Sequence, residues 1–255
     1  MMNNDLYRIG KIAISQKLPD KFLSVKVYSP KGTEKEYGFL YFLIEITTPW
    51  FPATEIGKAI EKSVISNFYS VQNSKNTESR FEEALKKTNL VLGELAKKGN
   101  TDWIGNLNIT IAAISGNKIY ITGTGKGLAF LLREKSLKNI YQKEKTIHSP
   151  LNTFTNIISG NLEAGDKILL TNEELLNQIH KEHLQTILQN FDPVTCVHEI
   201  AKILRKKKVT SVNSVILEFV AKDKIAFQPP PDLTDTVFLD RSQDLWIEKT
   251  IKKTN

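Results

Sequence analysis

The sequence predicts an α+β fold, a β-sandwich flanked by helices in α-β-β-α layers. Three observations carry this prediction. Segments rich in β-branched and aromatic residues come first, amphipathic helical segments follow, and apolar strands separated by short turns come after them. With 255 residues and 40% hydrophobic content, the chain is long enough for one large core. We therefore expect one main domain, residues 1–220, followed by a proline-containing tail, residues 221–255.

The first half of the predicted domain contains three strands and two helices. The strands cover residues 6–14, 22–28 and 37–46 and are separated by clusters of Pro, Lys, Gly and Asp. A helix is predicted to begin at Pro52, because Ile56, Ile60 and Val64 recur at every fourth position. A second helix covers residues 78–98, and Gly99 is expected to end it.

The second half returns to strands and then adds two more helices. Residues 107–133 are predicted to form antiparallel hairpins, because Gly116-Asn117 and the glycines of residues 123–127 permit tight turns. The apolar run 168–170 precedes a helix that Asn172 is expected to cap. Asp192 and Pro193 are typical of the start of another helix, which runs to residue 205, and residues 215–219 form a closing strand.

The charge, the apolar runs and the single cysteine bear on whether the protein binds nucleic acid, crosses a membrane or is exported. The net charge of +7 raises the question of nucleic acid, but the cations are spread along helices, many with an acid four residues earlier. The one dense cluster, residues 205–208, closes a predicted helix, where cations complement the dipole. The longest apolar run, residues 37–44, is far shorter than a membrane span, and the first residues lack a signal pattern. Cys196, the single cysteine, is predicted to be a buried structural thiol, which points to the cytoplasm.

Common catalytic motifs are missing from the sequence. It contains no Gly-x-Ser-x-Gly elbow and no P-loop, and the glycines of residues 123–127 fit a turn better than a nucleotide loop. His180 and His183 are predicted on one helix face, at a spacing that can bind a transition metal but is more often a solvated pair.

The order and spacing of segments over residues 18–219 resemble the PPM-type (type 2C) metal-dependent serine/threonine phosphatases. The stretch Leu-Pro-Asp-Lys-Phe at residues 18–22 is similar to the family's Asn-Glu-Asp-x-Phe strand, with Asp20 at the matching aspartate. Residues 43–46 resemble its Val-Ala-Asp-Gly, and residues 121–133 match its strand, Gly-Asp-Ser-Arg turn and next strand without a gap. Residues 168–177 resemble the Leu-Leu-Ser-Asp-Gly-Leu segment, and residues 211–213 the final Asp-Asn.

The resemblance implies two divalent cations, Mg²⁺ or Mn²⁺, held by carboxylates around a shared water. Most of the positions that match the family's acidic ligands lack a carboxylate, and among them only Glu173 keeps one in place. A lysine at a cation site adds repulsion and has no lone pair to donate. The predicted vestigial metal-site positions are Pro19, Asp20, Glu45, Ile46, Lys126, Glu173, Val212 and Asn213. Ile46, or Glu45 if the alignment shifts, stands for the Asp-Gly aspartate. No catalytic residue and no metal ligand are predicted.

The sequence thus favours a catalytically inactive PPM-like domain, a pseudophosphatase that acts in protein interaction or signalling with a partner it does not identify. A divergent metal-dependent phosphatase using Mg²⁺ or Mn²⁺ is the alternative, with Glu45, Glu173 and Glu174 gathering one ion; a basic nucleic-acid-associated protein is the second. We expect Lys126 to pair with Glu45, Glu173 or Glu174 in the abandoned cleft. The tail is expected to be a strap over the domain; the other reading is a docking peptide anchored by Leu245, Trp246 and Ile247.

Overall fold

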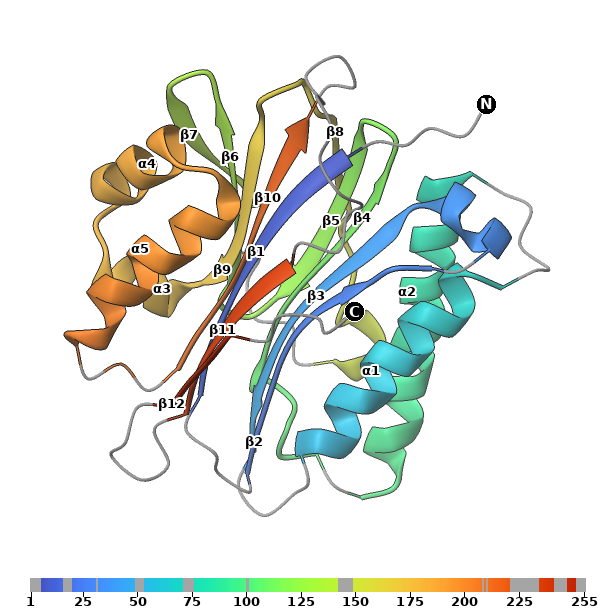
Figure 1. The fold of residues 1–255 in the computed structure, drawn as a ribbon. Coiled ribbons are helices and arrows are strands. Elements are labelled where there is room, and N and C mark those ends of the chain that lie inside the picture. The colour runs from blue at the N-terminus through green and yellow to red at the C-terminus, as the bar shows by residue number, and fades with distance from the viewer. Residues whose placement is uncertain are drawn as a thin grey trace. The chain divides into compact units, whose positions relative to one another are not determined.

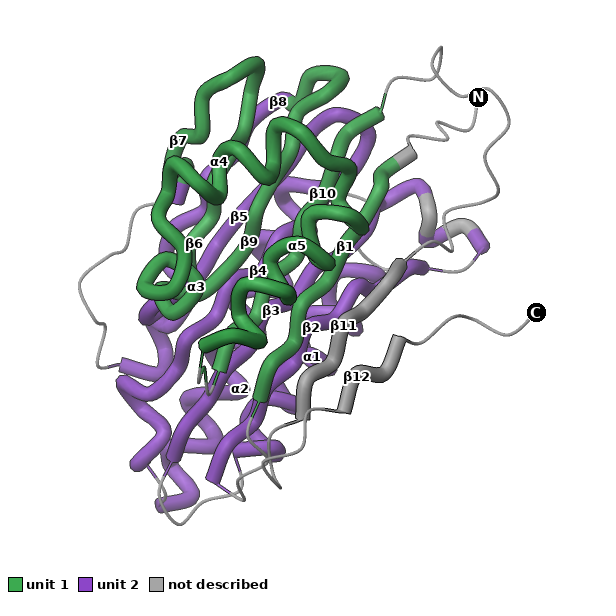
Figure 2. Tube along the Cα trace, turned by 60° about the vertical axis from the view of Figure 1, so that its left-hand side comes forward, with its two compact units in different colours: residues 1–17, 128–140, 162–255 green, residues 18–127, 141–161 purple. Residues whose placement is uncertain are grey.

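The chain forms two sheets and a set of helices, shown in Figure 1 as a computed structural model. It divides into two compact units, unit 1 with residues 1–17, 128–140 and 162–255, and unit 2 with residues 18–127 and 141–161 (Figure 2). The predicted α+β class is confirmed, because both sheets are built mainly from antiparallel strands and both have helices against them. The structure describes residues 6–15, 20–30, 32–48, 53–70, 76–99, 101–141, 149–207, 209, 211–220, 234–240 and 247–250.

Unit 2 is a five-stranded sheet with two helices on one face (Figure 1). Its strand order is β2 (Lys21–Tyr28), β3 (Phe39–Thr47), β4 (Leu107–Ser115), β5 (Lys118–Thr124) and β8 (Ile158–Asn161). Helices α1 (Ala53–Phe68) and α2 (Thr77–Lys97) bury their apolar stripes against it. Alternate residues of β3, such as Phe42 and Ile44, meet Ile60 and Val64 of α1 in one core cluster. The intervening residues of β3 therefore lie on the face away from the helices.

Unit 1 is a seven-stranded sheet with three helices (Figure 1). Helices α3 (Glu173–Gln178), α4 (Lys181–Asn190) and α5 (Pro193–Arg205) share a core cluster with strand residues such as Ile14 and Ile216. The strand order is β12 (Ile247–Thr250), β11 (Thr234–Asp240), β1 (Leu6–Ser15), β10 (Ser211–Val220), β9 (Lys167–Asn172), β6 (Gly127–Arg133) and β7 (Ser136–Tyr141). Short 3₁₀ helices at Gly32–Tyr37 and Pro150–Asn152 complete the secondary structure of the described residues. None of the helices in this part of the chain is long and apolar enough to cross a membrane.

Several local predictions are confirmed. Asp192 caps α5 through hydrogen bonds from the backbone N–H groups of Val194 and Thr195, at 3.0 and 3.3 Å. β4 and β5 form a hairpin closed by Gly116 and Asn117, and Gly116 has a φ of 57°. Cys196 is fully buried on α5. Asn172 stands at the predicted N-cap of α3, but its side chain makes no capping hydrogen bond there.

The turn at residues 123–127 does not close a hairpin as predicted. β5 belongs to the five-stranded sheet and β6 to the seven-stranded sheet, so the turn leads from one sheet to the other. Short glycine-rich turns between apolar strands usually join antiparallel neighbours, which is why the sequence indicated a hairpin. Turn length and apolar pattern mark where strands end, but strand partners are set by long-range pairing.

The helix predicted to begin at residue 173 is broken into α3 and α4 just before His180. Helix α3 ends at Gln178, and Ile179 has extended backbone with φ −130° and ψ 118°. His180 is the N-cap of α4 and His183 lies inside that helix. The break follows from burial, because Ile179 is only 2% exposed and turns into the core of unit 1. Both histidines thus belong to the start of α4, and both are exposed.

The C-terminal tail contributes two strands to the seven-stranded sheet, whereas the sequence favoured a strap laid over the domain. β11 pairs in parallel with β1 from Ile9↔Thr234 to Ser15↔Asp240, and β12 pairs antiparallel with β11. Strand β1 thus lies between β10 and β11. Two of the proposed docking anchors, Leu245 and Trp246, lie outside the described residues, and the domain boundary at residue 220 stays a prediction.

Gly10 allows β1 and α5 to approach closely, and we expect Gly10→Ala to lower the free energy of unfolding by about 1–3 kcal/mol. A Cβ at residue 10 would lie 2.3 Å from the backbone oxygen of Pro193 and 2.6 Å from Cγ2 of Val197. Because the first of these atoms belongs to the backbone of α5, the helix has to move. Urea unfolding of both proteins measures the difference. Gly160→Ala is the matched control, since nothing lies within 4 Å of a Cβ there; equal losses in the two variants would contradict this account.

Candidate functional site

Glu45 lies on the face of the five-stranded sheet that points away from the helices. Its neighbour Ile46 is fully buried in the cluster with α1 and α2, so the two side chains point to opposite faces. The pairing registers Leu23↔Glu45 and Glu45↔Asn108 place these three residues in one row across β2, β3 and β4. The sequence left Ile46 and Glu45 as alternatives for the Asp-Gly aspartate. Of the two, only Glu45 has a carboxylate and lies in this row.

Glu45 forms an ion pair with Lys21, the first residue of β2. The Lys21 Nζ atom lies 2.9 Å from Oε1 of Glu45, and each side chain is 11% exposed. Lys21 pairs with Thr47 in the register of β2 and β3, which puts it diagonally opposite Glu45 on the same face. The carboxylate of Glu45 is therefore already neutralised by an ammonium from the neighbouring strand.

Lys126 is not the partner of Glu45. Its side chain is exposed, and among the residues that the structure describes it makes no ion pair. Its backbone N–H donates to Oδ1 of Asn108 at 2.9 Å, which fixes the turn next to the Glu45 row. The prediction that Lys126 pairs with Glu45 is therefore wrong, because Lys21 takes that position. A pair of Lys126 with Glu173 or Glu174 stays a prediction.

Gly125 explains why the turn has this conformation. Its φ is +66°, in the left-handed region, and a Cβ there would lie 2.0 Å from the backbone oxygen of Leu107. The turn thus lies directly against the start of β4. Gly125 also lines a small hollow in unit 2. The residues around this hollow are Trp103, Ile104, Gly105, Leu107, Thr124, Gly125, Ser149, Pro150 and Thr153.

The two remaining predicted positions of unit 2 are Asp20 and Pro19. Asp20 immediately precedes β2, and its backbone oxygen accepts a hydrogen bond from the N–H of Thr48 at 2.9 Å. This bond holds the start of β2 against the end of β3, and so places Lys21 beside Glu45. Pro19 lies outside the described residues.

In unit 1 the three predicted positions have different surroundings. Glu173 is the first residue of α3, where an acid favours the positive end of the helix dipole. Val212 is fully buried in the core cluster with the helices. Asn213 is 1% exposed, its backbone oxygen accepts a hydrogen bond from Oγ1 of Thr171 at 3.1 Å, and its Oδ1 atom has no hydrogen-bond partner among the described residues.

The described residues do not fit a centre of two divalent cations. Such a centre needs several carboxylates converging at distances near 2 Å from each ion. Nowhere in the described part of the chain do three His, Cys, Asp or Glu side chains come together in a way that could hold a metal ion. Glu45 has the one carboxylate in the row of Leu23, Glu45 and Asn108, and it is paired with Lys21. The prediction that the protein uses no metal remains to be tested.

Cys196 is not a candidate nucleophile. Its thiol donates weakly to the backbone oxygens of Ile187 and Phe191, at 3.4 and 3.3 Å. Burial raises the pKa of this thiol to about 12. Because the thiolate is the reactive form, the side chain stays inert at neutral pH.

Comparison with solved structures identifies the fold. The catalytic domain of the serine/threonine protein phosphatase PstP, in complex with two manganese ions, matches with a TM-score of 0.66 at 14% identity, over 85% of this chain and 99% of that one. The serine/threonine phosphatase of S. agalactiae matches with a TM-score of 0.64 at 15% identity, over 84% and 100%. The PPM Ser-Thr phosphatase MsPP of Mycobacterium smegmatis matches with 0.57 at 11% identity, over 84% and 98%. The chain has the PPM phosphatase fold.

Identities this low establish the fold of a PPM phosphatase and not its activity. No protein-family model and no curated protein sequence matches the chain. The resemblance seen in the order of segments is thus confirmed at the level of structure. Whether the chain has lost the phosphatase chemistry depends on its side chains.

The sequence reasoning missed two residues beside Glu45, Lys21 and Asn108. Lys21 falls on the unspecified position of the family's Asn-Glu-Asp-x-Phe, so the motif drew no attention to it. Asn108 lies at the second residue of β4, inside an otherwise apolar strand. A polar residue at the end of a buried strand was the available signal. Its meaning appears only when the register places it beside Glu45.

For Lys126→Met we expect a change of less than ~0.5 kcal/mol in the free energy of unfolding, because an exposed side chain without an ion pair is removed. Gly125→Ala, one residue away, should cost at least ~1 kcal/mol, because alanine is strained at positive φ and meets the Leu107 oxygen. Thermal melts of the two variants measure both. A Lys126→Met protein as unstable as Gly125→Ala would contradict this prediction and show that the Lys126 side chain stabilises the fold.

Proposed function

We propose that this chain is a catalytically inactive PPM-type phosphatase-like domain that acts as a protein-interaction or regulatory module. The observation that carries the proposal is the Lys21–Glu45 pair, in which the one carboxylate of the β2–β3–β4 row is neutralised by the chain itself. A proline, a lysine and a valine at three other matching positions, Pro19, Lys126 and Val212, support it. The proposal includes no metal cofactor, a protein partner and a role in signalling. It also includes a cytoplasmic location, since the single cysteine is a free thiol.

The experiment that tests inactivity is hydrolysis of an aryl phosphate by the full chain in Mn²⁺ buffer. We expect no release of phenol above the rate in buffer alone, while the manganese-binding catalytic domain of PstP, measured in parallel, confirms the assay. Turnover that disappears both on addition of a chelator and in Glu173→Ala would overturn the proposal.

A divergent metal-dependent serine/threonine phosphatase is the second candidate. Glu173 favours it, because this acid stands at the N-terminus of α3 in the segment that resembles Leu-Leu-Ser-Asp-Gly-Leu. This candidate requires Glu45, Glu173 and Glu174 to gather one ion. The same assay distinguishes the two candidates, since only an active enzyme loses turnover in Glu173→Ala.

A further inference from the structure

The Lys21–Glu45 ion pair is largely buried on both sides. Both of its side chains are 11% exposed. Helix-surface pairs such as Lys86–Glu82, at 71% and 52% exposed, are open to water. Exposed pairs contribute little to stability, whereas removing one member of a buried pair leaves an uncompensated charge. Lys21 and Glu45 therefore depend on each other.

The backbone places the ammonium of Lys21 beside the carboxylate. Lys21 is held in the β2–β3 register opposite Thr47, and the preceding residue, Asp20, accepts a hydrogen bond from Thr48. On the other side of Glu45 lies Asn108, whose Oδ1 atom accepts a hydrogen bond from the backbone N–H of Lys126. Lys21 and Asn108, two neighbours of Glu45, are thus both held in place by contacts with the main chain.

An ammonium and a divalent cation compete for the same carboxylate. The Lys21 Nζ atom carries one positive charge and three N–H donors, so it can neutralise Glu45 and donate to its oxygen. A second cation at this oxygen would be repelled by the ammonium, and Lys21 has no lone pair to offer it. The pair therefore excludes a metal ion from Glu45 as long as Lys21 is present.

We propose that Lys21 is a built-in replacement for a divalent cation at Glu45, which holds the ends of β2 and β3 together without metal. The inference rests on the proposed inactive function and adds that the structure of the site does not depend on metal ions. The domain keeps its structure, and with it any partner-binding surface, whatever the concentration of Mg²⁺ or Mn²⁺ and in the presence of a chelator.

Thermal melts of the full chain test the inference, with Lys21→Met, Glu45→Gln and the double variant measured in EDTA and in millimolar Mn²⁺. The wild type should melt at the same temperature in both buffers. In EDTA, Lys21→Met should melt about 5 °C or more below the wild type. Mn²⁺ should recover at least about 2 °C of this loss. The double variant, which has neither charge, should melt closer to the wild type than either single variant and should not respond to Mn²⁺.

Lys86→Met is the matched control, since it removes the same group from an exposed pair and should change the melting temperature little. If Lys21→Met does not fold, the test uses the other two variants. The double variant should then still melt at a higher temperature than Glu45→Gln. Additive losses in the double variant, or a Lys21→Met protein that does not respond to Mn²⁺, would overturn the inference and leave the inactive function standing. A wild type stabilised by Mn²⁺ through Glu45, together with turnover in the aryl phosphate assay, would overturn both.

Discussion

Arg80→Met should lower the free energy of unfolding by about 3–5 kcal/mol, the largest effect we expect from a single substitution in this chain. The Arg80 side chain is 1% exposed although it belongs to the first turns of α2. Its Nη1 atom donates to the backbone oxygens of Phe68 and Ser70, at 3.2 and 3.3 Å. Its guanidinium carbon lies 3.5 Å from the centre of the Tyr37 ring.

Arg80 matters because it provides the cation that the end of α1 lacks. Helix α1 ends at Phe68 and has no basic residue in its last turn, where exposed carbonyls favour a positive charge. Arg80 reaches these carbonyls from α2 and stacks on Tyr37, so one side chain joins α1, α2 and the 3₁₀ helix before β3. Methionine fills part of the volume but leaves buried carbonyl oxygens without a donor.

Urea unfolding of Arg80→Met measures the loss, and Arg80→Lys separates charge from shape. Lysine keeps the charge but not the planar group that stacks and donates at several points, so an intermediate loss is expected. Lys86→Met on the same helix is the exposed control. An Arg80→Met protein that unfolds like this control would show that the buried contacts of Arg80 are not needed.

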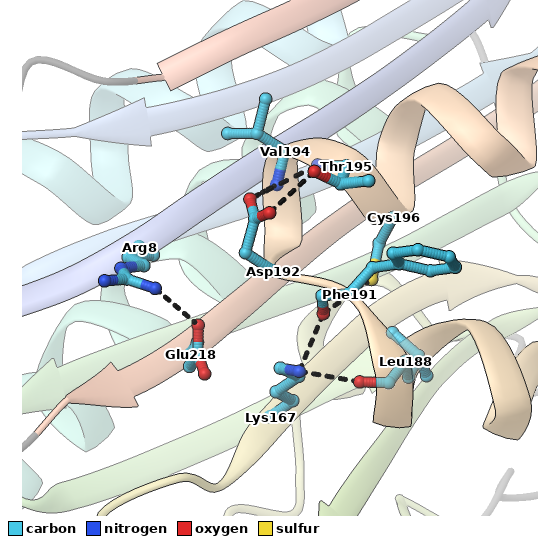
Figure 3. A network of polar contacts seen from close by, with 9 residues as sticks. All are labelled: Arg8, Lys167, Leu188, Phe191, Asp192, Val194, Thr195, Cys196 and Glu218. Carbon is cyan, nitrogen blue, oxygen red and sulfur yellow. Dashed lines mark hydrogen bonds and ion pairs between the residues drawn. The ribbon is translucent and has the colours of Figure 1, made fainter.

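Lys167→Met should lower the free energy of unfolding by about 2–4 kcal/mol. Lys167 is 7% exposed, and its Nζ atom donates to the backbone oxygens of Leu188 and Phe191, at 2.7 and 2.8 Å (Figure 3). These carbonyls belong to the last turn of α4 and to the residue that follows it. Asp192, the next residue, begins α5, so Lys167 attaches the α4–α5 junction to β9.

Two measurements check the role of Lys167. Thermal or urea unfolding gives the overall loss, and hydrogen exchange should show faster opening of α4 and the start of α5 than of the five-stranded sheet. Lys202→Met is the matched control, because Lys202 lies on the surface of α5 and pairs with Glu199. Unchanged protection of α4 in Lys167→Met would contradict the attachment.

The sequence predicts local structure well where one or two residues decide it. Asp192 and Pro193 determine the start of α5, and Gly116 with Asn117 determines the β4–β5 hairpin. The sequence does not predict strand pairing where no single turn decides it. The turn at Gly125 looks like a hairpin turn, but β5 and β6 belong to different sheets, because pairing depends on contacts far apart in the chain.

The candidate site shows the same limit. The family resemblance pointed to Glu45 and Lys126, and both lie at the same end of the five-stranded sheet, on either side of Asn108. The actual partner of Glu45 is Lys21, which no motif marked, because only the β2–β3 register brings it near. The residue that pairs with Glu45 thus lies on a neighbouring strand, at a position that the motif leaves unspecified.

Calorimetric titration of Mn²⁺ into the full chain tests most directly whether this PPM fold has lost its metal chemistry. We predict heats no larger than those of dilution, because Glu45 is neutralised by Lys21 and the described residues bring no carboxylate cluster together. Saturable binding that approaches two ions per chain and disappears in Glu45→Gln or Glu173→Ala would contradict this prediction and show that the metal centre is retained.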